Sequence, residues 1–397
     1  MAQQKMNKIE RRSVFTLAII MALRMLGLFM VLPLFALYAT HLPGATPALI
    51  GLAMGVYGLT QALLQIPFGA LSDRVGRKKI IALGLIIFII GSVIAALSQT
   101  IWGMLIGRAL QGAGAIGSTI IALIADLTRE EQRTKAMAIS GMTIGVSFSL
   151  AMILGPVFAA WINVNGIFWL AALFSLLGIV LLFTLVPHPT KPTWHPESEP
   201  DMHQFPVLLK NPELMRLNIG IFFLHAIFTA SFVVIPIALQ TLAKLHGNQQ
   251  WLLYLPILIL AFLLIIPCII IAEKKRCVRA FFLSGIVLLG VAEILFWVFV
   301  QNRLLSALSL LLFFLAFSLL EAFLPSLVSR TAPHSRKGTA LGIYSFSQYF
   351  GIFVGGALGG WLYGAFGLTQ VNLFCATLVL IWLGIAFNMK NPQYSTH

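Results

Sequence analysis

Five ionisable side chains interrupt hydrophobic runs that are otherwise long enough to cross a membrane: Arg24, Arg108, His225, Glu293 and Glu321. A charged group at the bilayer centre costs at least ~2.5–3.5 kcal/mol, so each should face a cavity or a polar partner. Burial drives a carboxyl group towards its neutral form, and an imidazole titrates close to neutrality. These residues therefore indicate proton transfer, with Glu321 as the main candidate carrier and His225 and Glu293 as the others.

Each of these residues also has a structural interpretation. Glu321 could brace the end of its helix, and His225 could be a hydrogen-bonded packing residue. Arg24 and Arg108 could donate to backbone carbonyl groups or hold two helices together. Glu293 could be a protonated acid facing lipid or the partner of a neighbouring helix.

Composition decides the class of protein to which these residues belong. The 397 residues are 59% hydrophobic and only 10% charged, with a mean hydropathy of +0.95. Soluble domains are about 25% charged, and membrane β-barrels show alternating segments of about ten residues, so both classes are excluded. The three cysteines are isolated, which indicates neither a disulfide framework nor a metal site. The first hydrophobic run is too long for a signal peptide, and we expect it to remain as a span.

The hydropathy pattern predicts an all-α polytopic membrane protein with about twelve spans of at least about 20 residues. Six spans form an N-terminal half over 13–187 and six a C-terminal half over 213–388, joined by a proline-rich linker at 188–212. The remaining ends are 1–12 and 389–397. The expected spans are 13–39, 47–71, 77–98, 101–124, 134–162, 166–187, 213–241, 250–272, 278–300, 303–327, 337–363 and 367–388.

The basic residues lie almost entirely on one side of these spans. Of the 26 lysines and arginines, only Lys244 and Arg303 fall on the other side, and only Arg24 and Arg108 lie inside spans. The positive-inside rule then places both termini and the linker in the cytoplasm. The net charge of +14 is dispersed among short loops, so we expect no nucleic-acid partner.

The most specific motif is the short polar loop between the second and third spans. It reads Gly69-Ala70-Leu71-Ser72-Asp73-Arg74-Val75-Gly76-Arg77-Lys78-Lys79. This pattern resembles the signature loop of the major facilitator superfamily of secondary transporters. The resemblance implies that Asp73 faces the start of the eleventh span near Lys337 and Gly338, and that Arg77 pairs with Asp126. Gly69, Asp73, Arg74, Gly76, Arg77 and Asp126 would then form a latch that closes the cytoplasmic side.

The two halves repeat at a spacing near 200 residues. Pro67 and Asp73 align with Pro267 and Glu273, and Gly155 and Trp161 align with Gly355 and Trp361. Repeated halves are the architecture of carriers that work by alternating access. The second copy of the loop, at 272–276, keeps its acid but lacks the glycines, so we expect an asymmetric latch.

The resemblance also implies positions for the buried polar residues. In this superfamily the first, fourth, seventh and tenth helices line a central cavity, and Arg24, Arg108, His225 and Glu321 fall on these helices, one each. The fourth helix carries Arg108 and Gly112 in the family's Arg-x-x-x-Gly pattern, whereas Glu293 falls on a peripheral helix. Tyr57, Gln61, Tyr344 and Gln348 would either hydrogen-bond across the interface between halves or contact substrate.

The fifth span carries Gly145, Ala151, Gly155 and Pro156. This run resembles the Gly-x-x-x-Gly-Pro antiporter motif of drug-efflux members, with alanine in place of the first glycine. Small residues permit close helix packing and the proline bends the helix. The motif favours export over uptake, and generic small-residue packing is the alternative.

Together these features predict a proton-coupled exporter of small, partly hydrophobic compounds in a bacterial-type inner membrane. We expect a monomer that uses the proton gradient and needs no cofactor or metal. The alternative is an importer or facilitator of a metabolite such as a sugar or siderophore; a non-transporting receptor or scaffold is less favoured, and no enzyme site is visible. Some relatives carry a C-terminal cytoplasmic domain, which we expect to be absent because about nine residues follow the last span.

Overall fold

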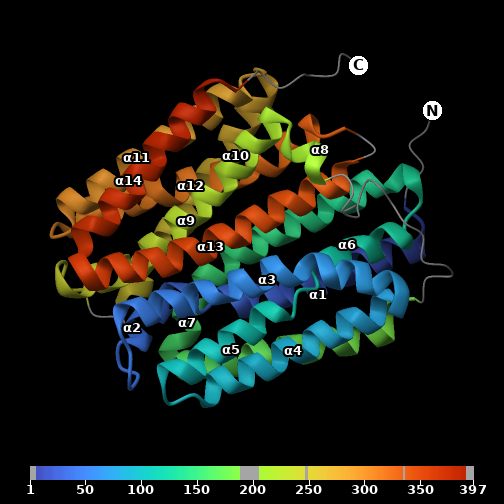
Figure 1. Ribbon diagram of the computed structural model, residues 1–397, viewed down its shortest axis with the longest axis horizontal. Helices are drawn as coiled ribbons and strands as arrows, with labels where there is room; N and C mark the ends of the chain where they lie inside the picture. Colours follow the sequence, from blue (N-terminus) through green and yellow to red (C-terminus); the bar gives the residue numbers. More distant parts are fainter. Residues whose placement is uncertain (1–5, 188–204, 246–248, 334–335, 390–397) are drawn as a thin grey trace.

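The structure is a computed structural model that describes residues 6–187, 205–245, 249–333 and 336–389. Most of the expected linker and tail, and residues 1–5, lie outside the described residues. Every regular element in the described part of the chain is a helix (Figure 1). The elements are α1 (Lys8–Phe29), α2 (Leu32–Ala39), α3 (Pro47–Val75), α4 (Arg77–Leu97), α5 (Ile101–Ala113), α6 (Gly117–Asp126), α7 (Glu130–Leu185), α8 (Phe205–Leu209), α9 (Pro212–Thr241), α10 (Gln250–Lys274), α11 (Val278–Phe299), α12 (Arg303–Thr331), α13 (Lys337–Phe366) and α14 (Leu368–Phe387).

Eleven helical segments among the described residues are long and apolar enough to cross a membrane. One of them, α7, has 56 residues and contains two of the expected spans. A straight helix of that length would measure about 84 Å, far more than a hydrocarbon core of about 30 Å. The chain therefore makes twelve crossings, as the hydropathy pattern predicts.

The reversal of α7 occurs at Asn163, which has the non-helical angles φ 61° and ψ 176°. Both ends of α7 lie beside the start of α1: Arg129 binds Glu10, and Arg12 donates to the carbonyl of Thr184. Near the reversal, Asn165 donates to the carbonyl of Ala96 at the other end of α4. The fifth and sixth crossings are thus antiparallel.

Two expected spans are interrupted rather than continuous. The first consists of α1 and α2, separated at residues 30–31, where Pro33 is one of the first residues of α2. Proline has no N–H and clashes with the preceding turn, so a helix starts there more easily than it continues. The fourth span is interrupted between Ala113 and Gly117, where Gly114 ends α5. Sequence patterns of hydropathy contain no signal for such interruptions.

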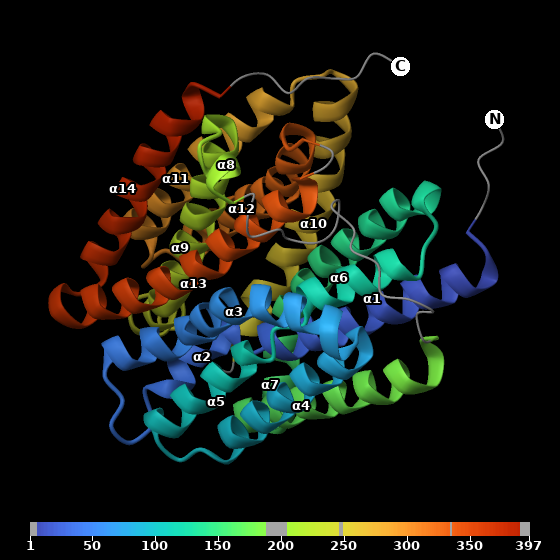
Figure 2. The ribbon, with the colours of Figure 1, turned by 45° about the vertical axis from the view of Figure 1, so that its right-hand side comes forward.

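The helices form two groups (Figures 1 and 2). In the N-terminal group, α7 packs on α1 and α4, and α5 packs on α3 and α4. In the C-terminal group, α11 packs on α12 and α14, and α13 packs on α9. The most extensive contact between the groups joins α3 to α13.

The two groups repeat the same contacts. A Cβ atom at Gly155 would lie 2.0 Å from the carbonyl oxygen of Met30, and one at Gly355 would lie 2.2 Å from that of Ala226. Both glycines therefore let the fifth helix of a group approach the first at backbone distance. A hydrogen bond from a cationic side chain to a carbonyl group at the end of a helix is repeated as well. Lys78 donates to the carbonyl of Val186, and Arg279 donates to that of Phe387.

The contact between α3 and α13 is concentrated at one end of the bundle. A Cβ atom at Gly51 would lie 2.2 Å from the carbonyl oxygen of Gly356, and one at Gly360 would lie 2.5 Å from that of Pro47. Both ribbon views show the helices close together at the Pro47 end of α3 and apart at its Val75 end (Figures 1 and 2). We call the end that holds Glu10, Asp73 and Glu273 the charged end. The other end holds Lys244 and Arg303 but no ion pair among the described residues, and we call it the uncharged end for short.

Candidate functional site

The polar loop at the charged end forms a buried ion-pair cluster. Gly76 alone separates α3 from α4, and its φ of 109° is strained for any residue with a side chain. This abrupt turn directs Arg77, which is 2% exposed, towards Asp126 at the end of α6, and Arg77 Nε lies 3.1 Å from Asp126 Oδ2. Arg77 also pairs with Asp73 and donates to Ser72 Oγ at 2.8 Å. The expected ion pair with Asp126 is present.

The other expected contact of this loop is not made in this conformation. The Asp73 side chain is 41% exposed, and among the described residues no hydrogen bond or ion pair joins it to α13. Gly69 likewise faces Ser118 of α6, in its own group of helices, rather than the other group. The physical reason is the divergence of α3 and α13 towards the charged end. Arg74 is exposed beside them.

Two further ion pairs fasten the charged end. Glu10 accepts hydrogen bonds from the backbone and side chain of Arg129, which ties α1 to the loop between α6 and α7. These bonds raise the pKa of Arg129 above its ordinary value. In the C-terminal group, Glu273 of α10 pairs with Arg330 of α12 at 2.6 Å. The second copy of the loop therefore keeps an ion pair between an acid and an arginine. In this copy the acid pairs directly with an arginine of another helix, whereas in the first copy Arg77 pairs with two acids.

Inside the N-terminal group, Arg24 and Arg108 are completely buried. Arg24 Nη2 donates to Gln61 Oε1 at 3.0 Å, and Arg108 Nη1 donates to Gln111 Oε1 at 2.8 Å. The guanidinium group of Arg108 also lies 4.4 Å from the ring centroid of Tyr57. Each arginine therefore has a glutamine partner, and in this conformation helices and aromatic rings enclose both.

Inside the C-terminal group, three expected residues from three helices form one cluster. Gln348 Nε2 of α13 donates to Glu321 Oε1 of α12 at 3.1 Å and lies 3.0 Å from His225 Nε2 of α9. His225 Nδ1 lies 3.3 Å from the carbonyl oxygen of Ile221, which assigns the proton to Nδ1 and leaves Nε2 to accept from Gln348. Glu321 Oε2 lies 3.8 Å from His225 Nε2, and the side chain is 29% exposed. The Oε2 atom itself is buried and has no hydrogen-bond partner among the described residues, so the cluster holds a carboxyl group with one unsatisfied oxygen.

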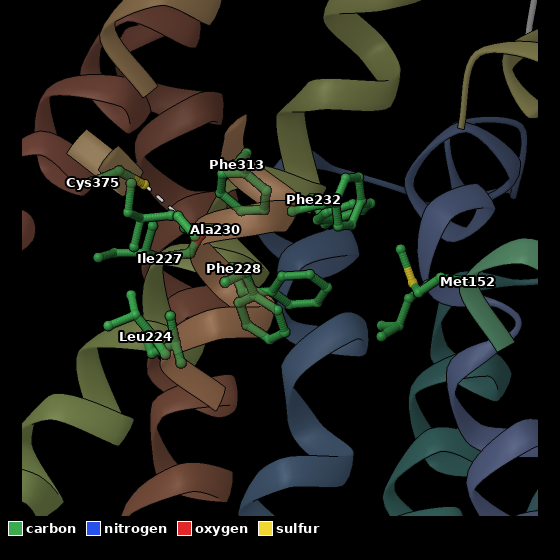
Figure 3. Packing of buried hydrophobic residues seen from close by; sticks show 14 of the residues in the cluster. Met152, Leu224, Ile227, Phe228, Ala230, Phe232, Phe313 and Cys375 are labelled. Carbon is green, nitrogen blue, oxygen red and sulfur yellow. Dashed lines mark hydrogen bonds between the residues drawn. The ribbon is translucent and has the colours of Figure 1, made fainter. Parts of the chain in front are cut away.

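Of the remaining expected residues, Glu293 lies apart from this cluster, whereas Tyr344 interacts electrostatically with Glu321. Glu293 is 3% exposed and accepts a 2.6 Å hydrogen bond from Ser231, at a contact of α11 with α9. The hydroxyl group of Tyr344 is buried without a hydrogen-bond partner among the described residues. Ser231 Oγ also lies 3.6 Å from Cys375 Sγ, and Figure 3 shows Cys375 beside Ile227 of α9. Glu293 is therefore a partner of a neighbouring helix rather than an acid facing lipid.

The antiporter-type run is only partly a packing motif. Ala151 and Pro156 are buried, and Gly155 contacts the interruption between α1 and α2. A Cβ atom at Gly145 would meet nothing within 4 Å, so the packing expected there is absent.

Aromatic side chains connect the two groups beside the polar cluster, a feature that the sequence analysis missed. Phe148 of α7 lies 5.1 Å from Phe29 of α1, 5.6 Å from Phe228 of α9 and 5.5 Å from Phe317 of α12, between ring centroids. Phe317 also lies 5.7 Å from the His225 ring. With 30 phenylalanines in the chain, composition offers no signal that selects these four. Figure 3 shows Phe228 with Phe232 and Phe313 in the same cluster.

Two more residues were missed, Gln111 and Tyr349. Gln111 relays the Arg108 contact to Ser92 of α4 at 2.9 Å, and its place three residues after Arg108 on a helix could have indicated the pair. Tyr349 of α13 interacts electrostatically with both Arg24 and Glu321. It directly follows Gln348, which was singled out, but nothing in its spacing indicated contact with both groups.

Comparison with known proteins agrees with this architecture. The family model described as Major Facilitator Superfamily matches residues 17–355. The chain is 45% identical over 394 residues to the inner membrane transport protein YajR of Escherichia coli K12, covering 99% of this chain and 87% of that protein. It is 26% identical over 243 residues to the quinolone resistance protein NorA of Staphylococcus aureus, covering 60% of this chain and 59% of NorA.

Among solved structures, a bacterial homolog of the human lysosomal transporter Spinster superposes with a TM-score of 0.76 at 16% identity, covering 96% of this chain and 97% of that one. This likeness shows the fold alone. The relatives are transporters and not enzymes, and the apolar helices make the protein a multi-pass membrane protein. The chain belongs to the Major Facilitator Superfamily of membrane transporters.

Proposed function

We propose that the protein exports small, partly hydrophobic compounds in exchange for protons by alternating access. The observation that carries the proposal is the cluster of Glu321, Gln348 and His225 beside aromatic side chains from both groups of helices. A carboxyl group without a lysine or arginine partner among the described residues can be neutralised by a proton, and the aromatic faces offer an apolar surface to a compound. The similarity to a quinolone resistance protein supports export.

In this mechanism the uncharged end is closed and the charged end is open. The glycine contacts of α3 with α13 hold the uncharged end together, whereas Asp73 makes no bond to α13 among the described residues. Closing the charged end would bring Asp73 to the N-terminus of α13, where exposed amides and the helix dipole favour a carboxylate by up to ~2 kcal/mol. Asp73, Arg77 and Asp126 then act as the latch of the closed state.

Protonation of Glu321 changes the balance between the two states. Glu321 is bound through Gln348 to α13, the helix that also contacts α3. Losing or gaining a charge there changes the stability of one state relative to the other, and each ~1.4 kcal/mol changes their ratio tenfold. The energy source is the proton gradient, so the cycle needs no further cofactor. The distribution of lysine and arginine supports a cytoplasmic location for the charged end and for both termini. In this proposal the protein works as a monomer.

Transport in vesicles of both orientations tests this function. The probes are radiolabelled aromatic compounds with neutral, cationic and anionic members. An exporter that exchanges protons for substrate accumulates at least one of them in inverted vesicles whose interior is acidified by respiration. Accumulation only in right-side-out vesicles would support the importer instead, and no gradient-dependent accumulation in either orientation would contradict proton coupling.

A further inference from the structure

The buried charges of the two groups of helices have opposite signs. Within the N-terminal group, the spans away from the charged end contain Arg24 and Arg108 and no aspartate or glutamate. Within the C-terminal group, the corresponding charged residues inside the spans are Glu293 and Glu321. The basic residues Lys244 and Arg303 lie at the far end of the helices rather than inside them. The interior of the N-terminal group is therefore cationic and has no carboxylate of its own to compensate for it.

Arg24 is the less satisfied of the two arginines. Its side chain is 0% exposed, and within the described ranges it makes one hydrogen bond, to Gln61. Its Nε and Nη1 atoms are buried and have no hydrogen-bond partner in the described part of the chain. The face of Phe88, 5.5 Å from the guanidinium carbon, compensates in part. Arg108 has the rings of both Tyr57 and Phe35 beside it, and only its Nε lacks a partner.

An unpaired buried guanidinium is costly, and a purely structural arginine would bind backbone carbonyl groups instead. The described contacts of Arg24 include no carbonyl group. The free Nε–H and Nη1–H groups point in different directions, and each can donate one charge-assisted hydrogen bond to an oxygen of a carboxylate, phosphate or sulfonate. The chemistry that fits this site is that of an oxyanion.

Arg24 also lies where the two groups of helices meet. Tyr349 of α13 interacts with it electrostatically, and a Cβ atom at Gly58 of α3 would lie 2.5 Å from the carbonyl oxygen of Tyr349. The backbone of α13 at Tyr349 therefore lies against α3, the helix whose Gln61 binds Arg24, and a movement of α13 away from α3 changes the surroundings of Arg24. Phe29, further along α1, packs against the cluster that contains Tyr349 and Phe88 and belongs to the aromatic contacts between the groups.

We propose that Arg24 binds the anionic group of the transported compound, and that the substrates are small amphiphilic organic anions. The apolar part of such a compound lies against the aromatic side chains around Phe148, while an oxygen of its anionic group accepts a hydrogen bond from a free nitrogen of Arg24. This inference rests on the proposed function in one respect, that the compound bound at this interface is the one transported.

Equilibrium binding to the purified protein tests the proposal without any gradient. The ligands are benzoate, 1-naphthoate and dodecanoate, each compared with its neutral amide of nearly the same shape. Hydrogen bonds to a charged group contribute about 1.5–3 kcal/mol, or about 10- to 100-fold in affinity. We expect the wild type to bind at least one of the three anions by about that factor more tightly than its amide.

Three variants test whether the preference for the anion over its amide depends on Arg24. Arg24→Gln should bind anion and amide within about twofold of each other, and Arg24→Lys should keep part of the preference because it keeps the charge. Arg12→Gln, which changes an exposed arginine on the same helix, should leave the preference for the anion unchanged. Unaltered amide binding by Arg24→Gln shows that the variant is folded, and if Arg24→Gln does not fold, Arg24→Lys carries the comparison.

The proposal is overturned if the wild type shows no preference for any anion, or if Arg24→Gln keeps that preference. It is also overturned if Arg12→Gln loses the preference to the same extent, since the anion would then bind the charged surface. Failure of proton-driven transport would leave these binding ratios unaffected, so the two proposals fail separately.

Discussion

Gln348 of α13 donates a 3.1 Å hydrogen bond to Glu321 of α12, which links the helix that packs on α3 to a buried carboxyl group. The same amide nitrogen lies 3.0 Å from His225 Nε2, so one side chain joins three helices. In the proposed mechanism, this connection transmits a change of charge on Glu321 to the interface between the groups of helices.

Replacing Gln348 by alanine should slow gradient-driven transport. The variant removes a hydrogen bond to a charged group, which is worth about 1.5–3 kcal/mol, so the expected loss of rate is about 10- to 100-fold. Initial rates in vesicles measure it. Gln301→Ala, at an exposed position, is the matched control. A wild-type rate in Gln348→Ala would remove Gln348 from the coupling route.

Replacing Asp126 by alanine should destabilise the protein strongly. The Asp126 side chain is 0% exposed and faces the buried Arg77, and breaking such a pair costs about 3–5 kcal/mol. Glu273→Ala removes an acid from a pair whose side chains are 38% and 32% exposed, which costs at most about 1 kcal/mol. Thermal unfolding in detergent compares them, and equal shifts in Tm would show that burial does not decide the effect.

Replacing Gly51 by alanine should open the uncharged end. The new methyl group would lie 2.2 Å from a carbonyl oxygen of α13, so the backbones must separate. Gly145→Ala is the matched control, because nothing lies within 4 Å of its position. Distances between spin labels at His41 and Thr369 should lengthen in Gly51→Ala alone. An unchanged distance distribution would show that these glycines do not hold the end closed.

Replacing Asn163 by glycine should stabilise the protein. A non-glycine residue at φ 61° and ψ 176° carries strain of about 1–3 kcal/mol, which glycine relieves and valine increases. The Tm should therefore fall in the order Asn163→Gly, wild type, Asn163→Val. A Tm for Asn163→Val at or above that of the wild type would argue against a reversal of α7 at this residue.

Local patterns carried the prediction of the fold, but not of the contacts between helices. Hydropathy predicted twelve crossings because each span is a short stretch of chain. The pairing of Arg77 with Asp126, 49 residues away, was expected only from the family resemblance of the loop at 69–79. The interruption between α1 and α2 and the role of Tyr349 depend on which helices approach one another, which spacing along the chain does not encode. The position of Asp73 depends on the conformational state, and one sequence is compatible with more than one state.

Exchange and accumulation by Glu321→Gln test the central claim, proton coupling through Glu321, most directly. Glutamine keeps the shape and hydrogen bonding of the protonated acid but cannot release a proton. The variant should exchange labelled for unlabelled substrate across the membrane and fail to accumulate it against a gradient. Glu293→Gln, at the buried acid outside the cluster, should do both. Accumulation by Glu321→Gln at the wild-type level would contradict the account.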